Sequence, residues 1–247
     1  MPPSTFDILI LNGRPAAGKS EVIDYLKKVP LGERIRRFHI GEFEEIDDFP
    51  ILWERFEDDD LYERHGRERK YSDTEFIYKG QRHKGYVFKE KFFWNFLIEK
   101  LNLAYEKRFL RERRQGCTAI IEFSRGSEHG GFREAYQHLS DAVLSCAATL
   151  YIQVSFEESL RKNRRRYNPD RPDSILQHAL EDTKLEMLYG ESDWEDFSRP
   201  DPTHLIVKGH RIPYYVLQNE PEITDKPDLL GIELDKAFQT LWRLRNP

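Results

Sequence analysis

The stretch ILILNGRPAAGKSEVIDYL, residues 8–26, decides the fold. A short hydrophobic run leads into the pattern Gly-x-x-x-x-Gly-Lys-Ser at residues 13–20, and an amphipathic segment follows. Side-chain packing gives no reason for this order. Phosphate binding does, because backbone N–H groups at a helix N-terminus form an anion site. The stretch therefore predicts a strand, a phosphate-binding loop and a helix in direct succession.

The residue types in this loop suit the phosphates of a nucleotide. Gly13 and Gly18 permit a close approach of the backbone that a residue with a Cβ resists. Lys19 is expected to bridge the β- and γ-phosphates and to be catalytic, and Ser20 is expected to bind Mg²⁺. The residues that we expect to contact the nucleotide here are Gly13, Ala16, Ala17, Gly18, Lys19, Ser20 and Glu21.

The composition excludes several other classes of protein. The net charge of −5 argues against nonspecific binding to nucleic acid, which normally needs a basic excess. Cys117 and Cys146 have neither metal-ligand nor disulfide spacing, which predicts a reducing, cytoplasmic location. No segment resembles a signal peptide or approaches the roughly 18 apolar residues of a membrane span. We expect residues 1–247 to form a single domain, and the sequence leaves a homodimer open.

Strand and helix patterns alternate along the chain, which is typical of a parallel sheet covered by helices. The expected strands are residues 6–11, 35–40, 118–123, 148–154 and 212–217. The expected helices are residues 20–28, 88–114, 132–139, 156–167, 174–189 and 229–244. The pattern predicts an α/β fold, a three-layer sandwich around a mostly parallel sheet of about five strands.

Two regions interrupt this alternation. The first, about residues 42–95, contains a possible hairpin at residues 75–88 with its turn near Gly80. The second, about residues 156–190, contains an arginine-rich helix and the polar loop YNPDRPDS at residues 167–174. Insertions at the carboxyl ends of strands often hold substrates. We interpret the first region as an acceptor-binding insertion and the second as a lid, with solvated surface excursions as the alternative.

Charged residues follow two of the expected strands. In TAIIEFSRG, Glu122 ends an apolar strand, where it could hold Mg²⁺ through water, and Arg125 comes three residues later. In LYIQVSFEESLRKNRRRY, Arg161, Arg164 and Arg165 share one face of a helix. Guanidinium groups on such a helix can neutralise the charge of a phosphate in transfer. A solvated helix face is the alternative interpretation of this arginine run.

The order of these motifs resembles that of the P-loop nucleoside and nucleotide kinases, the small-molecule kinase branch of the P-loop NTPase superfamily. The segment EFSR is similar to the Asp-Arg-Ser or Glu-Arg-Ser of these kinases, and the arginine helix is similar to their lid. The resemblance implies a P-loop NTPase fold in which Arg125 binds the acceptor, Arg161 and Arg165 act in catalysis, and Arg164 binds ATP. It also implies that Asn219 touches the adenine of the donor.

The same resemblance implies a carboxylate base just after the second strand. In FHIGEFEEIDDF our choice is Glu42, which would also bind the acceptor, with Glu44 or Asp47 as the next choices. A base serves an acceptor hydroxyl, whereas an acceptor phosphate needs arginines. The insertion contains both carboxylates and arginines, so the sequence leaves both a hydroxyl and a phosphate open as the accepting group. The arginines that lie downstream of Glu42 include Arg55, Arg64, Arg67 and Arg69.

The expected function is that of a kinase that transfers the γ-phosphate of ATP, with Mg²⁺, to a nucleoside or nucleotide. One alternative is a kinase of another small molecule, such as a sugar, an antibiotic or a nucleotide sugar. Another is a P-loop NTPase or regulatory nucleotide-binding protein without transfer. A GTPase switch is disfavoured, because its nearest motif matches, DKPD at residues 225–228 and DLLG at residues 228–231, occur in the wrong order.

Overall fold

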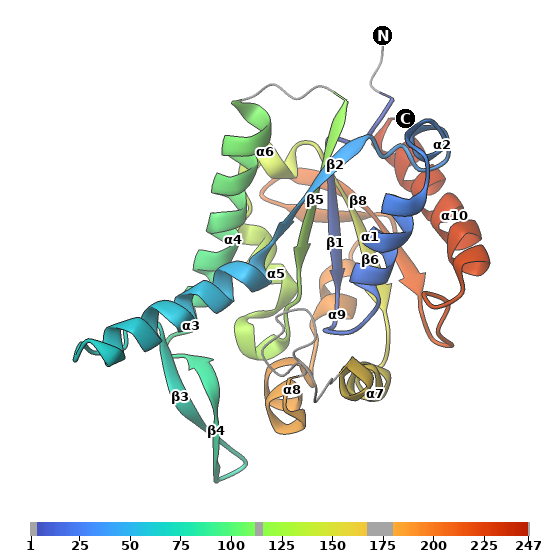
Figure 1. Ribbon diagram of the computed structural model, residues 1–247. Helices are drawn as coiled ribbons and strands as arrows, with labels where there is room; N and C mark the ends of the chain where they lie inside the picture. The colour runs from blue at the N-terminus through green and yellow to red at the C-terminus, as the bar shows by residue number, and fades with distance from the viewer. Residues whose placement is uncertain (1–3, 112–115, 167–179, 247) are drawn as a thin grey trace.

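The computed structural model describes residues 4–111, 116–166 and 180–246, which form a three-layer α/β fold (Figure 1). Its central sheet has six strands in the order β2-β5-β1-β6-β8-β7. All neighbouring strands are parallel except β7, which is antiparallel to β8 at one edge. The strands are β1 (Ile8–Gly13), β2 (Glu42–Asp47), β5 (Cys117–Phe123), β6 (Ala147–Gln153), β7 (His204–Val207) and β8 (His210–Gln218).

Helices cover both faces of the sheet. On one face Leu9 and Leu11 of β1 pack under α1 (Lys19–Lys28), α2 (Leu31–Phe38) and α10 (Pro227–Arg245). On the other face Ile8 and Ile10 pack under a second group of elements. These are α4 (Phe92–Tyr105), the π-helix Glu106–Leu110, α5 (Gly131–His138), α6 (Asp141–Leu144) and α9 (Trp194–Ser198). Burial on both faces explains why residues 8–11 of β1 form a continuous apolar run.

The insertion after β2 extends away from the sheet (Figure 1). It consists of α3 (Asp48–Arg64) and a hairpin of β3 (Ser72–Tyr78) and β4 (Gln81–Phe88), and it leads into α4. The buried carboxylate of Asp59 holds the chain between α3 and β3 by accepting hydrogen bonds from the backbone N–H groups of residues 70–72. The hairpin and its turn at Gly80 are confirmed.

The expected lid contains two helices, and the second of them lies beside this insertion (Figure 1). They are α7 (Phe156–Arg166) and α8 (Asp182–Tyr189), and the loop YNPDRPDS between them lies outside the described residues. An apolar cluster joins α8 to α3 and α4, and it includes Leu52, Phe56, Trp94, Leu185 and Leu188. The insertion and the second lid helix therefore share one small core. Within the described ranges, the helices offer no segment both long and apolar enough to cross a membrane.

The expected strand at residues 35–40 is wrong. Those residues mostly belong to α2, which buries Arg34 and Phe38 at i, i+4 spacing and ends at His39 in a left-handed conformation. A short apolar run does not distinguish a strand from a helix by its periodicity. The second strand is β2, whose sequence EFEEID is largely polar because β2 lies at the edge of the sheet and is half exposed. The sheet has six strands rather than about five because the short β7 adds one edge.

Candidate active site

The phosphate-binding loop connects β1 to α1 and has the backbone that the glycine pattern predicts. Gly13 has φ +155°, and a Cβ there would lie 2.8 Å from the carbonyl oxygen of Ile152. Gly18 has φ +118°, and a Cβ there would lie 2.8 Å from side-chain atoms of Asn219 and Thr224. Any larger residue at either position would therefore push the loop away from its neighbours.

Lys19 and Ser20 begin α1 at the end of this loop. The Lys19 side chain is buried, and its Nζ donates to Ser124 Oγ at 2.8 Å and lies 3.7 Å from Glu122 Oε1. Ser20 is exposed and lines the adjoining cavity. Glu21, by contrast, turns its carboxylate to Arg166 of α7 at 3.1 Å. The structure thus brings Lys19, Ser20 and Glu122 together, as the sequence predicts.

Three carboxylates gather at the carboxyl edge of the sheet. Asp47 ends β2 directly beside Glu122, which lies near the end of β5, and Asp48 begins α3. Burial, together with the nearby charges of Glu122 and Asp48, raises the pKa of Asp47 to about 8. Burial also raises the pKa of Glu122, although Lys19 opposes that shift. The site therefore concentrates negative charge that protons or a bound cation would offset.

Glu42 is not part of this group. It begins β2 and pairs in register with Cys117, whereas Asp47 pairs with Glu122 at the other end of the same two strands. Five residues along a strand separate Glu42 from this edge by roughly 16 Å. Its carboxylate lies 3.4 Å from Arg34 instead. The choice of Glu42 as the base followed from the misplaced second strand, and Asp47 occupies the position that the choice required.

Arg125 lines the cavity as predicted, but its charge is already paired. Its guanidinium lies 2.6 Å from Asp48 Oδ2, donates to the backbone carbonyl of Trp94 at 3.0 Å, and is buried. The ring of Trp94 lies 5.3 Å from the guanidinium carbon. The ion pair therefore fixes the start of α3 against the end of β5, and it leaves Arg125 little charge to offer to a phosphate.

Most of the predicted lid arginines face away from the cavity. Arg161 and Arg165 contact Glu222 of the loop after β8, at 3.1 and 2.8 Å. Arg164 is exposed and contacts Asp182 at 2.6 Å. None of these three lines the cavity, so the structure does not bring them to the phosphate loop. The helix face that was assigned to the phosphates in fact faces Glu222 and solvent.

Arg166 is the arginine of α7 that lines the cavity, next to Asn163. Arg166 was not among the predicted site residues because it lies outside the i, i+3, i+4 set of the other three. Ser159, on the same helix, donates to the carbonyl oxygen of Pro15 at 2.7 Å. This bond ties α7 to the phosphate loop and sets which face of the helix points inward.

Asn219 has a structural contact in place of the predicted adenine contact. Its side chain is fully buried, and its Nδ2 donates to the carbonyl oxygen of Ala17 at 2.7 Å and to Thr224 Oγ1 at 2.9 Å. Its Oδ1 accepts from the backbone N–H groups of Ile223 and Thr224. With both ends of the amide occupied, Asn219 holds the phosphate loop against the loop after β8.

One cavity of about 450 Å³ extends from the phosphate loop to the hairpin. It is bounded by the phosphate loop, the three carboxylates, α3, β4, the start of α4, and the lid helices. Its wall includes a group of aromatic side chains, which are Phe49, Phe56, Tyr86, Phe88, Trp94 and Tyr189. Phe56 and Tyr86 stack at 5.2 Å between ring centroids. The wall is therefore suited to a flat, largely apolar molecule.

His129 was not singled out from the sequence, and it also lines this cavity. It lies in the short 3-10 helix Ser127–His129 and stacks on Trp94 at 3.8 Å between ring centroids. Burial, together with the charge of Arg125, lowers its pKa well below the usual value, so the ring is neutral. Its Nδ1 accepts from the backbone N–H of Gly126 at 3.3 Å, so the proton lies on Nε2.

The sheet order and the Gly-x-x-x-x-Gly-Lys-Ser loop between β1 and α1 define the class of the fold, which is that of the P-loop NTPases. The fold is similar to that of Chaetomium thermophilum Kti12, solved in complex with ADP-AlF3, at 14% identity and TM-score 0.48 over 96% of this chain and 97% of that one. It is also similar to APE1195, at 13% identity and TM-score 0.38 over 95% and 98%. No protein-family model and no curated protein matches the sequence.

Proposed function

We propose that the protein is a kinase that transfers the γ-phosphate of ATP to a hydroxyl group of a small molecule bound in the aromatic cavity. The observation that carries the proposal is that a single cavity contains both Lys19 and Ser20 of the phosphate loop and a wall suited to an acceptor. A nucleotide-binding switch or regulator needs the phosphate loop but does not need the aromatic part of the cavity. The cavity therefore favours transfer to an acceptor over hydrolysis alone.

The charges at the reacting end favour a hydroxyl over a phosphate as the accepting group. An acceptor phosphate would meet Asp47 and Glu122, and Arg125 is already paired with Asp48. None of the insertion arginines, Arg82 included, lines the cavity, and Arg69, for example, contacts Asp60 at 2.7 Å. A nucleoside or another hydroxyl compound therefore fits better than a nucleoside monophosphate, and a sugar or an antibiotic remains the competing acceptor.

Asp47 is the proposed general base. In the transfer, Asp47 accepts the hydroxyl proton, the acceptor oxygen bonds to the γ-phosphorus, and the bond from that phosphorus to the β–γ bridging oxygen breaks to release ADP. A base with a pKa near neutrality suits this proton transfer. Lys19 and Arg166 would neutralise the charge that develops on the phosphates.

Ser20 and Glu122 fit a magnesium site of the kind that phosphate-binding loops use. Both offer oxygen atoms, and the pKa of Glu122 is raised first by burial and then by the charges of Asp48 and Glu45, all of which a bound cation would offset. Within the described ranges no three His, Cys, Asp or Glu residues form a metal cage. Mg²⁺ usually takes one or two protein ligands and keeps several waters. Bound with ATP, it would neutralise charge on the β- and γ-phosphates.

The test is ADP release from Mg²⁺-ATP by the purified protein, alone and with a panel of nucleosides, nucleoside monophosphates and sugars. A hydroxyl acceptor is expected to raise turnover well above the rate of hydrolysis, and Lys19→Ala is expected to abolish it. If ATP binds but no acceptor stimulates turnover, the kinase proposal fails and a hydrolase or regulatory role replaces it. Transfer to the phosphate of a monophosphate, which would give a nucleoside diphosphate, would overturn the choice of a hydroxyl as the accepting group.

A further inference from the structure

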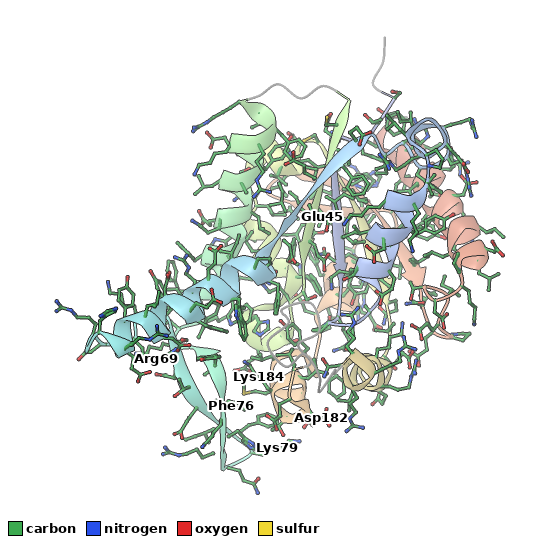
Figure 2. All side chains as sticks on the ribbon, viewed as in Figure 1. Glu45, Arg69, Phe76, Lys79, Asp182 and Lys184 are labelled. Carbon is green, nitrogen blue, oxygen red and sulfur yellow. The ribbon has the colours of Figure 1, made fainter. Side chains whose placement is uncertain are left out.

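Lys184 places a cationic group in the wall of the acceptor cavity, away from the phosphate loop. Helix α8 runs along the cavity wall from Lys184 to Tyr189, about 7.5 Å along its axis. At the Tyr189 end, the backbone carbonyl accepts a hydrogen bond from Arg14 of the phosphate loop. At the other end, Lys184 lies between α8 and the hairpin (Figure 2), and its Nζ donates to the backbone carbonyl of Tyr86. Lys184 therefore belongs to the hairpin end of the cavity.

Lys184 differs from the other cations of the cavity in its partners. Each of the others has a carboxylate nearby, in the pairs Lys19–Glu122, Lys89–Asp73, Lys91–Glu134, Arg125–Asp48 and Arg166–Glu21. In the part of the chain that the structure describes, Lys184 has no carboxylate in ion-pair contact. Glu181 attracts the Lys184 ammonium without an ion-pair contact, so the charge at the hairpin end is only partly balanced, whereas the reacting end has an excess of carboxylates.

The surroundings of the Lys184 ammonium group are apolar. Its Nζ lies 5.8 Å from the centre of the Phe56 ring, and Leu180 and Met187 line the same cavity. Burial lowers the pKa of Lys184 to about 8, so the charged form predominates at neutral pH. The Tyr86 carbonyl takes one of the three N–H donors of the ammonium. A ligand anion would satisfy the remaining donors and balance the buried charge.

We propose that Lys184 binds an anionic group of the acceptor, a carboxylate or a phosphate, at the end opposite to the hydroxyl that receives the γ-phosphate. The acceptor class is then a flat, largely apolar compound with a hydroxyl at one end and an anion at the other. The assignment of the hydroxyl end rests on the proposed kinase function. The anion site itself rests on the cavity and on the partners of Lys184.

Lys184 could also have a purely structural role, which would be to join α8 to the hairpin. A second contact between these two elements provides a control variant that tests this role. Lys79 of the hairpin turn contacts Glu186 of α8 at 2.8 Å, but Lys79 is exposed and does not line the cavity (Figure 2). Lys79→Gln removes a link between the same two elements without touching the proposed site. Lys184→Gln keeps a donor for the Tyr86 carbonyl and removes only the charge.

The experiment is calorimetric titration of the full chain with two matched pairs of probes. The first pair is 4-hydroxybenzoate and its uncharged analogue 4-hydroxybenzamide, and the second is uridine 5′-monophosphate and uridine. The wild-type protein is expected to bind the anionic member of at least one pair about tenfold more tightly. Lys184→Gln is expected to erase this preference, and Lys79→Gln to retain it. The pair that shows the preference identifies the anion as a carboxylate or a phosphate.

Several outcomes would overturn the anion site. They are equal affinity for both members of each pair, no binding of either anion, and loss of the preference in Lys79→Gln as well as in Lys184→Gln. The last would show that docking of α8 on the hairpin, rather than charge, is responsible. An anion preference that depends on Lys184 in a protein that phosphorylates no acceptor would keep this site while removing the kinase proposal.

Discussion

Asp47 lies among carboxylates at the end of β2, where burial and the charges of Glu122 and Asp48 raise its pKa to about 8. If Asp47 is the base, it must be deprotonated to act. We therefore expect kcat/KM to rise about tenfold per pH unit below the pKa that Asp47 has in the complex with Mg²⁺-ATP and to level off above it. Asp47→Asn should remove this dependence along with most of the activity. Measurement of kcat/KM from pH 5.5 to 9.5, with the acceptor that the panel identifies, tests both expectations.

Glu42 provides the control for this experiment. It lies on the same strand as Asp47 but at the other end, in contact with Arg34. Glu42→Gln should leave both the pH profile and the rate unchanged. A lost profile in this variant, or a normal profile in Asp47→Asn, would exclude Asp47 as the base and return the choice to the other carboxylates.

The same substitution at Asp47 should stabilise the protein. The folded-state pKa of Asp47 exceeds the ordinary value of 3.8, so its ionisation costs stability as the pH rises between the two values. Asn removes that cost and retains the side-chain oxygen that caps α3 through the N–H of Phe49. We expect the free energy of unfolding to increase by ~1–3 kcal/mol at pH 8 and to match the wild type near pH 4. Urea unfolding at the two pH values measures it, and a destabilised variant at pH 8 would contradict the raised pKa.

At the scale of elements, the loop after β8 fixes the position of α7 through Glu222. Its carboxylate contacts Lys162 at 3.0 Å and Arg165 at 2.8 Å, and these cations lower its pKa to about 2. Glu222→Gln should reduce the free energy of unfolding by about 1–2 kcal/mol at pH 7, because Lys162 is buried and would lose its partner. The loss should fade as the pH falls from 4.5 toward 2, where the wild-type carboxylate also takes up a proton.

Hydrogen exchange of α7 would locate this effect. In Glu222→Gln the amides of α7 should exchange faster, whereas those of β1 should keep their protection. Asp182→Asn is the matched control, because it removes an exposed pair with Arg164, and such pairs contribute little. Equal effects of the two substitutions would mean that Glu222 does not anchor the helix.

At the scale of the whole molecule, the sequence predicts the features that depend on a local pattern of residues. It does not predict the features that depend on how distant segments of the chain pack together. The phosphate loop and the inner strands were predictable because glycine spacing and burial on both faces leave a strong signal in β1 and β5. The edge strand β2 lacks that signal, and its misplacement led to Glu42. The face of α7 that meets the cavity is set by Ser159 on Pro15, a contact between residues 144 positions apart. No sequence motif near Lys184 marks it as a site residue, because its proposed role depends on the hairpin that packs against α8.

These long-range contacts predict that nucleotide binding stabilises the whole fold. Asn219 joins the phosphate loop to the loop after β8, and Glu222 joins that loop to α7. Mg²⁺-ATP at 100 times its Kd should raise the free energy of unfolding by about 2.7 kcal/mol. ATP with a chelator should stabilise the protein less, because Ser20 and Glu122 would then meet the phosphates without the cation. Lys19→Ala should show little stabilisation by either. Equal stabilisation with and without Mg²⁺ would contradict the metal site, and no stabilisation would contradict nucleotide binding itself.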